Sequence, residues 1–150
     1  MDRIMLHKVN VTQAITKRDQ SECFTIRTEV FVAEQGVPKE EELVEEAQTT
    51  IHALARINSV PVATGRLITI NNKNARIGSM AVKIEYRRIG VASLVLDFLE
   101  EKAREKGIQH ITLEAQEYVK NFYSDRGYYE RGGVFLDVGI PHIKMVKELR

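Results

Sequence analysis

The sequence predicts an α/β domain of the α+β kind, in which helices flank a mixed, mostly antiparallel central sheet with a parallel β-α-β core. Three observations lead to this prediction. Alternating apolar residues recur in several short runs separated by turns over residues 51–82. A helical repeat of apolar residues follows over residues 94–103, and a further strand pattern comes directly after it. A helix placed between two strands in this way joins them as parallel neighbours within an otherwise antiparallel sheet.

The first predicted elements are a strand and a helix. Residues Met5 to Val11 alternate in hydropathy as a strand does. The stretch from Lys39 to Ala47 is rich in glutamate and is predicted to be a short helix or an ordered loop facing water. Between these two segments lies a helical repeat that ends near Gly36-Val37-Pro38 and consists of Cys23, Ile26, Arg27, Val30 and Phe31.

An antiparallel meander is predicted next. Its strands cover Ile51 to Ile57, Val62 to Ile70 and Ala75 to Val82, and its turns fall at residues 58–59 and 71–74, where asparagine is frequent. The meander leads directly into the β-α-β core.

The core helix ends at Gly107, a residue suited to a left-handed cap. A strand from Gln109 to Ala115 follows, and a right-handed crossover makes strands 75–82 and 110–115 parallel. A ligand crevice is expected at their carboxyl ends. One face of the helix is apolar and is formed by Leu94, Val95, Phe98, Leu99 and Ala103.

The remaining sequence predicts a short helix and two strands. The helix covers Tyr118 to Asp125 and stops at Gly127. The strands Tyr128 to Val138 and His142 to Glu148 surround a turn at Gly139-Ile140-Pro141.

Composition excludes several classes of protein. The 150 residues fit one domain over residues 1–150, and 43% hydrophobic content supplies a core without disulfides or metals. The 22 basic and 21 acidic residues give a formal charge of +1, so neither nucleic acid nor an anionic membrane is expected as a partner. Cys23 is the only cysteine, and the polar N-terminus lacks a signal-peptide pattern, which makes the cytoplasm the expected compartment.

The loop before the core helix suits an anion. Residues 85–93 read Glu-Tyr-Arg-Arg-Ile-Gly-Val-Ala-Ser, with small residues at positions 90, 92 and 93. The first amides of a helix have no intrahelical partner, so they can donate hydrogen bonds to a phosphate, and Arg87 or Arg88 can add a charged contact. The loop alone is equally compatible with an ordinary turn, and the absence of Gly-Lys-Ser/Thr argues against a P-loop nucleotide site.

Three motifs resemble the GNAT superfamily of acyl-CoA-dependent N-acyltransferases. Residues 87–92 match its Gln/Arg-x-x-Gly-x-Gly/Ala motif, after the strand Arg76-Ile77-Gly78-Ser79-Met80-Ala81-Val82. Asn121-Phe122-Tyr123-Ser124-Asp125-Arg126-Gly127-Tyr128 resembles its second motif, a short helix that ends in glycine before an aromatic residue. Residues 27–35 and Ile51-His52 resemble the small bacterial branch typified by the ElaA and YjcF-like groups.

The resemblance implies a GNAT fold and acetyl-CoA as co-substrate, without a metal. It implies that Tyr123 is the general acid that protonates the leaving thiolate, and that Asn121 and Tyr123 line the thiol end of the cofactor. The backbone of Met80, Ala81 and Val82 would pair with the pantetheine arm, in the place where the parallel strands separate. The pyrophosphate loop would comprise Arg87, Arg88, Ile89, Gly90, Val91, Ala92 and Ser93.

An amine acceptor must lose a proton before it attacks the thioester, so a base is required. Glu114, at the end of the strand bordering the crevice, is the first candidate, and His142 is the second; His52 is a weaker one. A backbone amide near Ala81 or Val82 could stabilise the oxyanion. Cys23 lies on an apolar helix face, so no acyl-cysteine is expected.

The acceptor is the least determined part of the prediction. By resemblance, the segment with Arg27, Glu34 and Gln35 walls the acceptor pocket, and the glutamates of residues 39–47 could attract a cationic amine. A small primary amine is favoured, and a protein lysine or N-terminus is the variant. A non-catalytic acyl-CoA sensor or partner-binding module is the alternative function, and a homodimer is left open.

Overall fold

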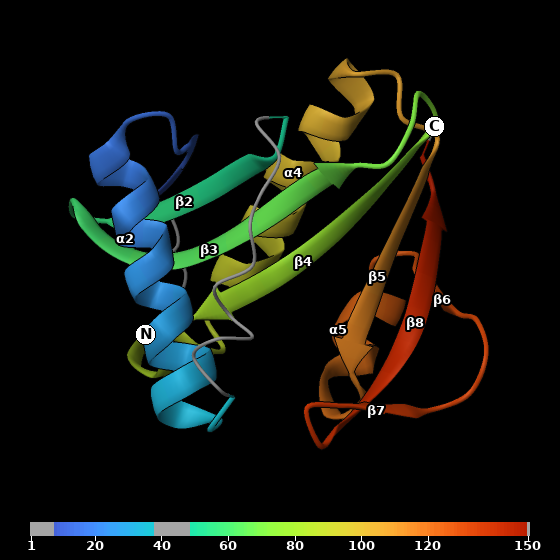
Figure 1. The fold of residues 1–150 in the computed structure, drawn as a ribbon. Coiled ribbons are helices and arrows are strands. Elements are labelled where there is room, and N and C mark those ends of the chain that lie inside the picture. Colours follow the sequence, from blue (N-terminus) through green and yellow to red (C-terminus); the bar gives the residue numbers. More distant parts are fainter. Residues whose placement is uncertain (1–7, 38–48, 150) are drawn as a thin grey trace.

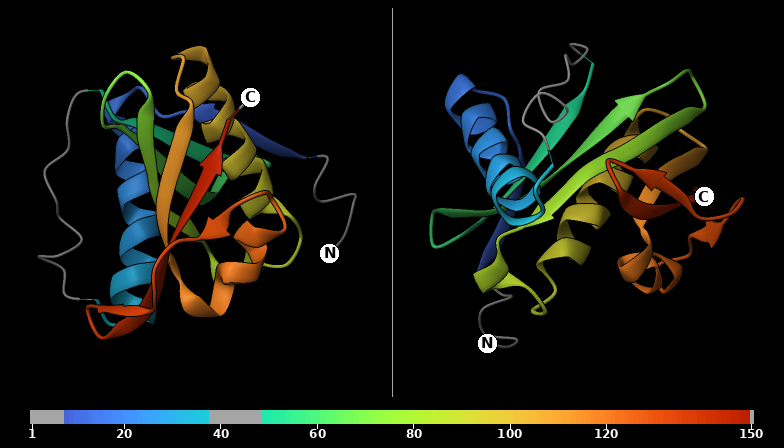
Figure 2. Two further views of the ribbon diagram at one scale, coloured as in Figure 1. Left: turned by 90° about the vertical axis from the view of Figure 1, so that its right-hand side faces the viewer. Right: turned by 60° about the horizontal axis from the view of Figure 1, so that its bottom comes forward.

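The computed structural model describes residues 8–37 and 49–149. Its centre is a twisted eight-stranded sheet with the order β1-β2-β3-β4-β5-β8-β6, and β7 pairs with β8 off this path (Figures 1 and 2). All neighbouring strands are antiparallel except β4 and β5. The prediction of a mixed, mostly antiparallel sheet with a parallel pair is therefore confirmed. The strands are β1 (Val9–Gln13), β2 (Ile51–Ile57), β3 (Val60–Thr69), β4 (Asn74–Val82), β5 (His110–Gln116), β6 (Tyr129–Glu130), β7 (Phe135–Asp137) and β8 (Ile140–Glu148).

Two main helices cover opposite faces of the first half of the sheet (Figure 1). Helix α2 (Lys17–Arg27) begins after Thr16, whose side chain accepts a hydrogen bond from the Asp19 amide at 3.0 Å. It continues directly into η1 (Thr28–Glu34), which is a π-helix. Helix α4 (Val91–Glu105) is the predicted core helix and lies on the other face. The short helical segments are η2 (Ile84–Tyr86), η3 (Glu117–Val119) and α5 (Lys120–Ser124).

The sheet therefore has a core on each side. On the α2 side, Cys23, Ile26 and Val30 pack against Leu54 of β2 and Ala81 of β4. The larger core lies between the sheet and α4, because the apolar face of α4 meets the alternate, inward residues of the strands. Its fully buried members include Val62, Leu67, Ile77, Val95, Leu96, Leu99, Ile111 and Met145.

The parallel strands β4 and β5 pair over only a short length. Asn74 to Arg76 align with His110 to Thr112, and no further pairs join the two strands. A bulge in β4 near Ser79, which has a φ of 51°, shifts the register with β3 in this region. Beyond it the strands diverge, so a widening gap separates their carboxyl ends (Figure 1).

Near the C-terminus the structure differs from the predicted strands. The predicted strand from Tyr128 to Val138 is two short pieces, β6 and β7, because Gly132 has a φ of 86° and interrupts the pairing with β8. The turn lies at Val138 and Gly139, both with positive φ, and Pro141 belongs to β8 instead of the turn.

Two predictions fall wholly or partly outside the described residues. The first residues of the predicted strand from Met5 and the whole of the glutamate-rich segment from Lys39 to Ala47 lie there. Within residues 8–37 and 49–149, no helix is long and apolar enough to cross a bilayer.

Candidate cofactor and active site

The loop that precedes α4 has the backbone shape expected of an anion site. Arg88 and Gly90 both have left-handed backbones, with φ of 65° and 90°, and Gly90 caps the helix. The Leu94 amide makes the first bond of the helix, to the Gly90 carbonyl at 3.4 Å. The amides of Val91 to Ser93 precede it and therefore have no intrahelical acceptor. They lie at the positive end of a 15-residue helix.

The side chain of Arg87 faces other protein groups. Its two terminal nitrogens donate to the two carboxylate oxygens of Glu34, both at 2.7 Å. Its Nε donates to the Val82 carbonyl at 2.9 Å. The Arg87 guanidinium lowers the pKa of Glu34, and the carboxylate in turn raises the pKa of Arg87. Arg88 is exposed.

The final residues of β4 present backbone groups to the gap. The Lys83 amide donates to the Val62 carbonyl on β3 at 2.9 Å. Because successive residues of an antiparallel strand direct their amides to opposite sides, the Val82 amide is directed away from β3. That side is the gap between β4 and β5.

Tyr123 lies in α5, which follows β5, and only 7% of its surface is exposed. Its ring makes edge contacts with Phe122 and Tyr128, at centroid distances of 5.0 and 5.8 Å. Burial raises the pKa of Tyr123 well above its ordinary value, so its phenol is protonated at neutral pH. Within the described part of the chain, no hydrogen bond joins this hydroxyl to another protein group. Asn121 precedes it in α5 and is exposed.

The two candidate bases differ in their surroundings. His142 is 8% exposed, and its Nδ1 lies 2.7 Å from the Ile140 carbonyl. A carbonyl only accepts, so this contact places the proton of the neutral imidazole on Nδ1 and leaves Nε2 as the basic nitrogen. Glu114 is exposed and lies 3.9 Å from Arg76. His142 aligns with Gln116, the last residue of β5, and is therefore farther along the gap than Glu114.

The predicted acceptor residues all lie on the α2 side of the sheet. Arg27 is 7% exposed and its NH1 lies 3.2 Å from His52 Nδ1. Glu34 pairs with Arg87, as described above, whereas Gln35 exchanges two hydrogen bonds with Gln116, at 2.9 and 3.3 Å. The end of η1 therefore contacts the polypeptide on both sides of the gap.

A buried polar network beside α4 was not predicted. Glu100, 4% exposed, accepts hydrogen bonds from the Tyr128 hydroxyl and from Lys147 Nζ, both at 2.9 Å. Tyr128 in turn packs against Tyr123. The network thereby fixes the segment that carries Tyr123 onto the helix of the candidate anion site. A glutamate within an otherwise apolar helix face was the only sequence signal for it.

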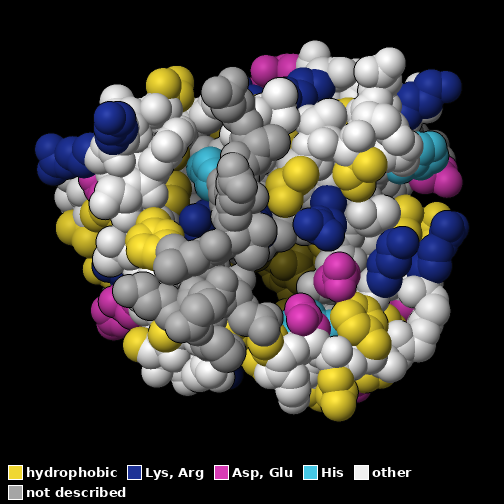
Figure 3. Space-filling model, in the orientation of Figure 1, with side chains coloured by type: hydrophobic (Ala, Val, Ile, Leu, Met, Phe, Trp, Pro, Cys, Tyr) yellow, Lys and Arg dark blue, Asp and Glu magenta, His cyan; other side chains and the backbone are white. Residues whose placement is uncertain are grey.

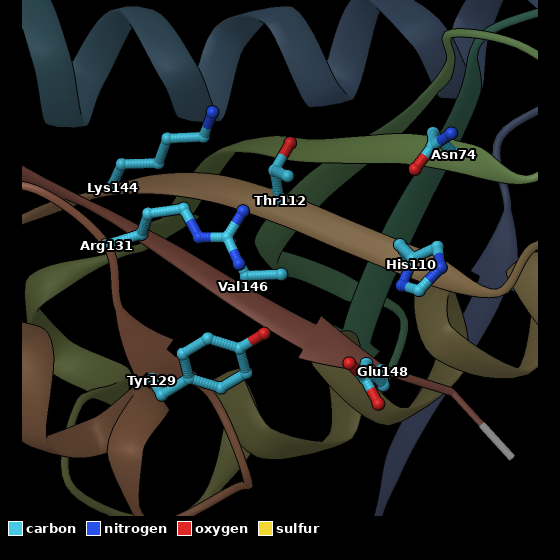
Figure 4. Close-up of a pocket in the computed structure, with 8 residues that line it drawn as sticks. All are labelled: Asn74, His110, Thr112, Tyr129, Arg131, Lys144, Val146 and Glu148. Atoms are coloured by element: carbon cyan, nitrogen blue, oxygen red, sulfur yellow. The ribbon is translucent and has the colours of Figure 1, made fainter.

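The surface is hollowed where the strands diverge. Figure 3 shows a depression near the centre of the face, at the position of the gap between β4 and β5 in Figure 1, with hydrophobic side chains at depth and charged ones around it. Two further hollows lie along the sheet. One, of about 220 Å³, includes Glu114 and Lys144. The other, of about 270 Å³, lies between β5, β6 and β8 and contains neither Tyr123 nor His142 (Figure 4).

Residues 8–37 and 49–149 contain no group of three or more His, Cys, Asp or Glu side chains that could hold a metal ion.

Comparisons with known proteins identify the family. A family model described as an acetyltransferase (GNAT) domain matches residues 12–149. The uncharacterized N-acetyltransferase YjcF of Bacillus subtilis is 34% identical over 128 residues, which cover 85% of this chain and 91% of YjcF.

Solved structures share the fold. Escherichia coli ElaA has a TM-score of 0.84 at 23% identity, with 93% of this chain and 99% of ElaA covered. An aminoglycoside 6'-N-acetyltransferase complexed with coenzyme A has a TM-score of 0.73 at 14% identity, with 93% and 96% covered. The family match extends over nearly the whole sequence, and the sheet is that of its structural neighbours. The chain belongs to the GNAT acetyltransferase family.

Proposed function

We propose that this protein transfers an acetyl group from acetyl-CoA to the primary amine of a small molecule, by direct attack of the amine on the thioester. The observation that carries the proposal is the position of the α4 N-terminus beside the gap between β4 and β5. The free amides of this helix end would suit the pyrophosphate of the cofactor. The edge of β4 there, which among the described residues does not pair with β5, would suit its pantetheine arm.

The cofactor would be held mainly by backbone groups. The amides of Ile89 to Ser93 would donate to the pyrophosphate, and the edge of β4 from Met80 to Val82 would pair with the amides of the pantetheine arm. Arg88 is better placed than Arg87 for a charged contact with a phosphate, because three of the five N–H donors of Arg87 are already used. Asn121 would lie at the thiol end.

Proton removal from the amine falls to His142 in this proposal. Its Nε2 is the basic nitrogen, and the hydrogen bond of Nδ1 fixes the orientation of the ring. Glu114 stays as the second candidate, although it is exposed and lies 3.9 Å from Arg76. The amine nitrogen then attacks the thioester carbonyl, and the Val82 amide would stabilise the oxyanion that forms.

Tyr123 would assist departure of the sulfur. When the carbon–sulfur bond breaks, the bonding electrons pass to the sulfur, whose conjugate acid has a pKa near 8.5. The raised pKa of Tyr123 keeps its phenol protonated, and so able to donate to the developing thiolate. The same raised pKa opposes early and complete proton transfer, so the phenol first acts as a hydrogen-bond donor and the proton follows as the bond breaks.

Cofactor binding is tested first by a substitution at the helix N-terminus. Ala92→Asp places a carboxylate where the proposal puts the pyrophosphate, although an acidic residue in the first turn stabilises a helix. We expect the variant to fold normally and to lose the thermal shift that coenzyme A gives the unaltered protein. Ala92→Asn is the control of matched size and should keep most of that shift. The proposal would be contradicted if the thermal shift that coenzyme A gives the unaltered protein were no larger than the shift that ATP gives.

Catalysis is tested by release of free thiol from acetyl-CoA across a library of amines. Tyr123→Phe should lower kcat about 100-fold without weakening coenzyme A binding. His142→Gln should lower the rate at neutral pH, and part of the loss should be recovered at higher pH, where the free amine is more abundant. Binding of coenzyme A without turnover on any amine would favour a sensor over an enzyme.

A further inference from the structure

Two adjacent residues at the end of η1 connect the two sides of the cleft between β4 and β5. Glu34 binds Arg87 through both carboxylate oxygens at 2.7 Å, and Arg87 belongs to the loop that follows β4. Gln35 binds Gln116, the last residue of β5, through a pair of amide hydrogen bonds at 2.9 and 3.3 Å. We refer to Glu34, Gln35, Arg87 and Gln116 as the bridge residues.

The position of the bridge follows from the local backbone. In a π-helix each amide bonds five residues back, and the Gln35 amide does so to the Val30 carbonyl at 3.2 Å. Gly36 then turns the chain with a φ of 76°. Glu34 and Gln35 are thus the last residues before the turn, and they lie across the part of the sheet where β4 and β5 no longer pair.

Arg87 takes part in both of the structures that the bridge connects. Its backbone begins the loop proposed to bind the pyrophosphate, whereas its side chain holds Glu34 and, through Nε, the Val82 carbonyl at 2.9 Å. The two parallel N–H···O bonds to Glu34 fix the guanidinium plane as well as its position. Immobilising the loop therefore affects η1 through the Arg87 side chain.

We propose that the bridge residues are positioning residues that fasten η1, the wall of the acceptor side, to the cofactor loop, so that donor binding orders this wall before the amine arrives. This inference rests on the proposed use of coenzyme A. Binding of the cofactor immobilises the loop, so less entropy is lost when Arg87 is held against Glu34, and the pairing becomes stronger. The side chains of the bridge residues need not touch either substrate.

The alternative is that cofactor binding releases η1 instead of ordering it. If Arg87 turned to a phosphate of the cofactor, it would leave Glu34, and η1 would be released by donor binding. Amide hydrogen exchange distinguishes the two, because it reports the opening of residues 28–37 directly and needs no knowledge of the acceptor.

The experiment measures hydrogen exchange by mass spectrometry on the full chain with and without coenzyme A. We expect saturating coenzyme A to slow exchange over residues 28–37 about fivefold or more, together with slowing over the loop from Arg88 to Leu94. In Glu34→Gln, the loop should still be protected by coenzyme A, whereas residues 28–37 should no longer respond.

The control variant is Arg56→Met, which removes a comparable ion pair between α2 and the sheet, Arg56 with Asp19 at 2.8 Å, without touching the cofactor loop. It should leave the effect of coenzyme A on residues 28–37 intact. Protection of the loop without any change over residues 28–37 in the unaltered protein would overturn this inference alone, and so would faster exchange there. Absence of protection at the loop would overturn the proposed function and this inference with it.

Discussion

The contact between β3 and α4 can be tested with a single methyl group. Gly65 lies on β3 directly under the helix, and a Cβ added there would lie 2.5 Å from Met80 Sδ, 3.0 Å from Leu99 Cδ1 and 3.1 Å from Val95 Cγ1. Leu99 and Val95 are fully buried and have no room to withdraw. Gly65→Ala therefore overpacks this core, which costs about 1–3 kcal/mol in comparable cases.

Gly78→Ala supplies the matched control. Gly78 lies on β4, its φ is not positive, and a Cβ there would meet nothing closer than Arg66 Nε at 3.9 Å. Replacing glycine by alanine also restricts the unfolded chain, which stabilises both variants by about 0.4–1 kcal/mol. That gain is shared, so the difference between the variants isolates the overpacking cost of about 1–3 kcal/mol.

The assay is urea unfolding of both variants and the unaltered protein, followed by circular dichroism, with one m-value for all three. We expect Gly65→Ala to be less stable than the unaltered protein and Gly78→Ala to be equal or slightly more stable. Because Met80 belongs to the strand edge proposed to bind pantetheine, Gly65→Ala should also weaken coenzyme A binding. Variants within about 0.5 kcal/mol of each other would show that the contact between β3 and α4 is looser than described.

Three further predictions concern single side chains. Tyr128→Phe removes a hydrogen bond to the buried Glu100 carboxylate and should lower the free energy of unfolding by about 1.5–3 kcal/mol; the exposed Tyr129→Phe should change it by less than about 0.5 kcal/mol. Cys23 is 1% exposed and burial raises the pKa of its thiol, so a thiol reagent should modify it much more slowly in buffer than in urea. Thr16→Ala removes the N-cap of α2 and should cost about 0.5–2 kcal/mol in the same unfolding assay; an unchanged unfolding midpoint would exclude a stabilising cap.

The β-α-β core could be predicted from the sequence because its signals are local. The period of the apolar residues changes from two to 3.6 and back within residues 75–115, and Gly90 stands where the helix begins. That glycine, with its positive φ, marks the point where the loop becomes the helix. The break between β6 and β7 was equally local, since Gly132 and Gly133 signal an interruption that the alternating pattern concealed.

The contacts that organise the cleft could not be predicted in the same way, because they join residues far apart in sequence. Glu34 and Arg87 are separated by 53 positions, and Gln35 and Gln116 by 81. By resemblance, Glu34 is expected to wall the acceptor pocket, and the structure shows that its carboxylate is held by an arginine. A charged side chain near a site can contact the substrate, or it can hold another protein group in place. Which of the two it does depends on its partner, and only the tertiary fold identifies that partner.

The partner of Glu34 also gives the bridge a definite dependence on pH. Among the described residues, Arg87 is the charged group that acts on Glu34, and it lowers the pKa of Glu34 in the folded protein. A carboxyl group whose pKa is lower when folded adds stability above its unfolded pKa, and this stability is lost as pH falls through the folded pKa. The Arg87 side chain is 33% exposed and the Glu34 side chain is 36% exposed. Solvent screening therefore keeps the stability that the ion pair adds below about 1 kcal/mol.

Carbon NMR of the Glu34 carboxyl measures this directly. The carboxyl should titrate below the ordinary range of a glutamate, and Arg87→Met should move its pKa upward. In unfolding experiments, the stability lost in Glu34→Gln should be greatest near neutral pH and should shrink as the pH falls below about 4, because the unaltered carboxyl is then protonated as well. If the stability difference stays constant down to pH values where the carboxyl is protonated, the ion pair is not the source of that difference. The geometry of the hydrogen bonds in the bridge would then matter more than the charge of Glu34.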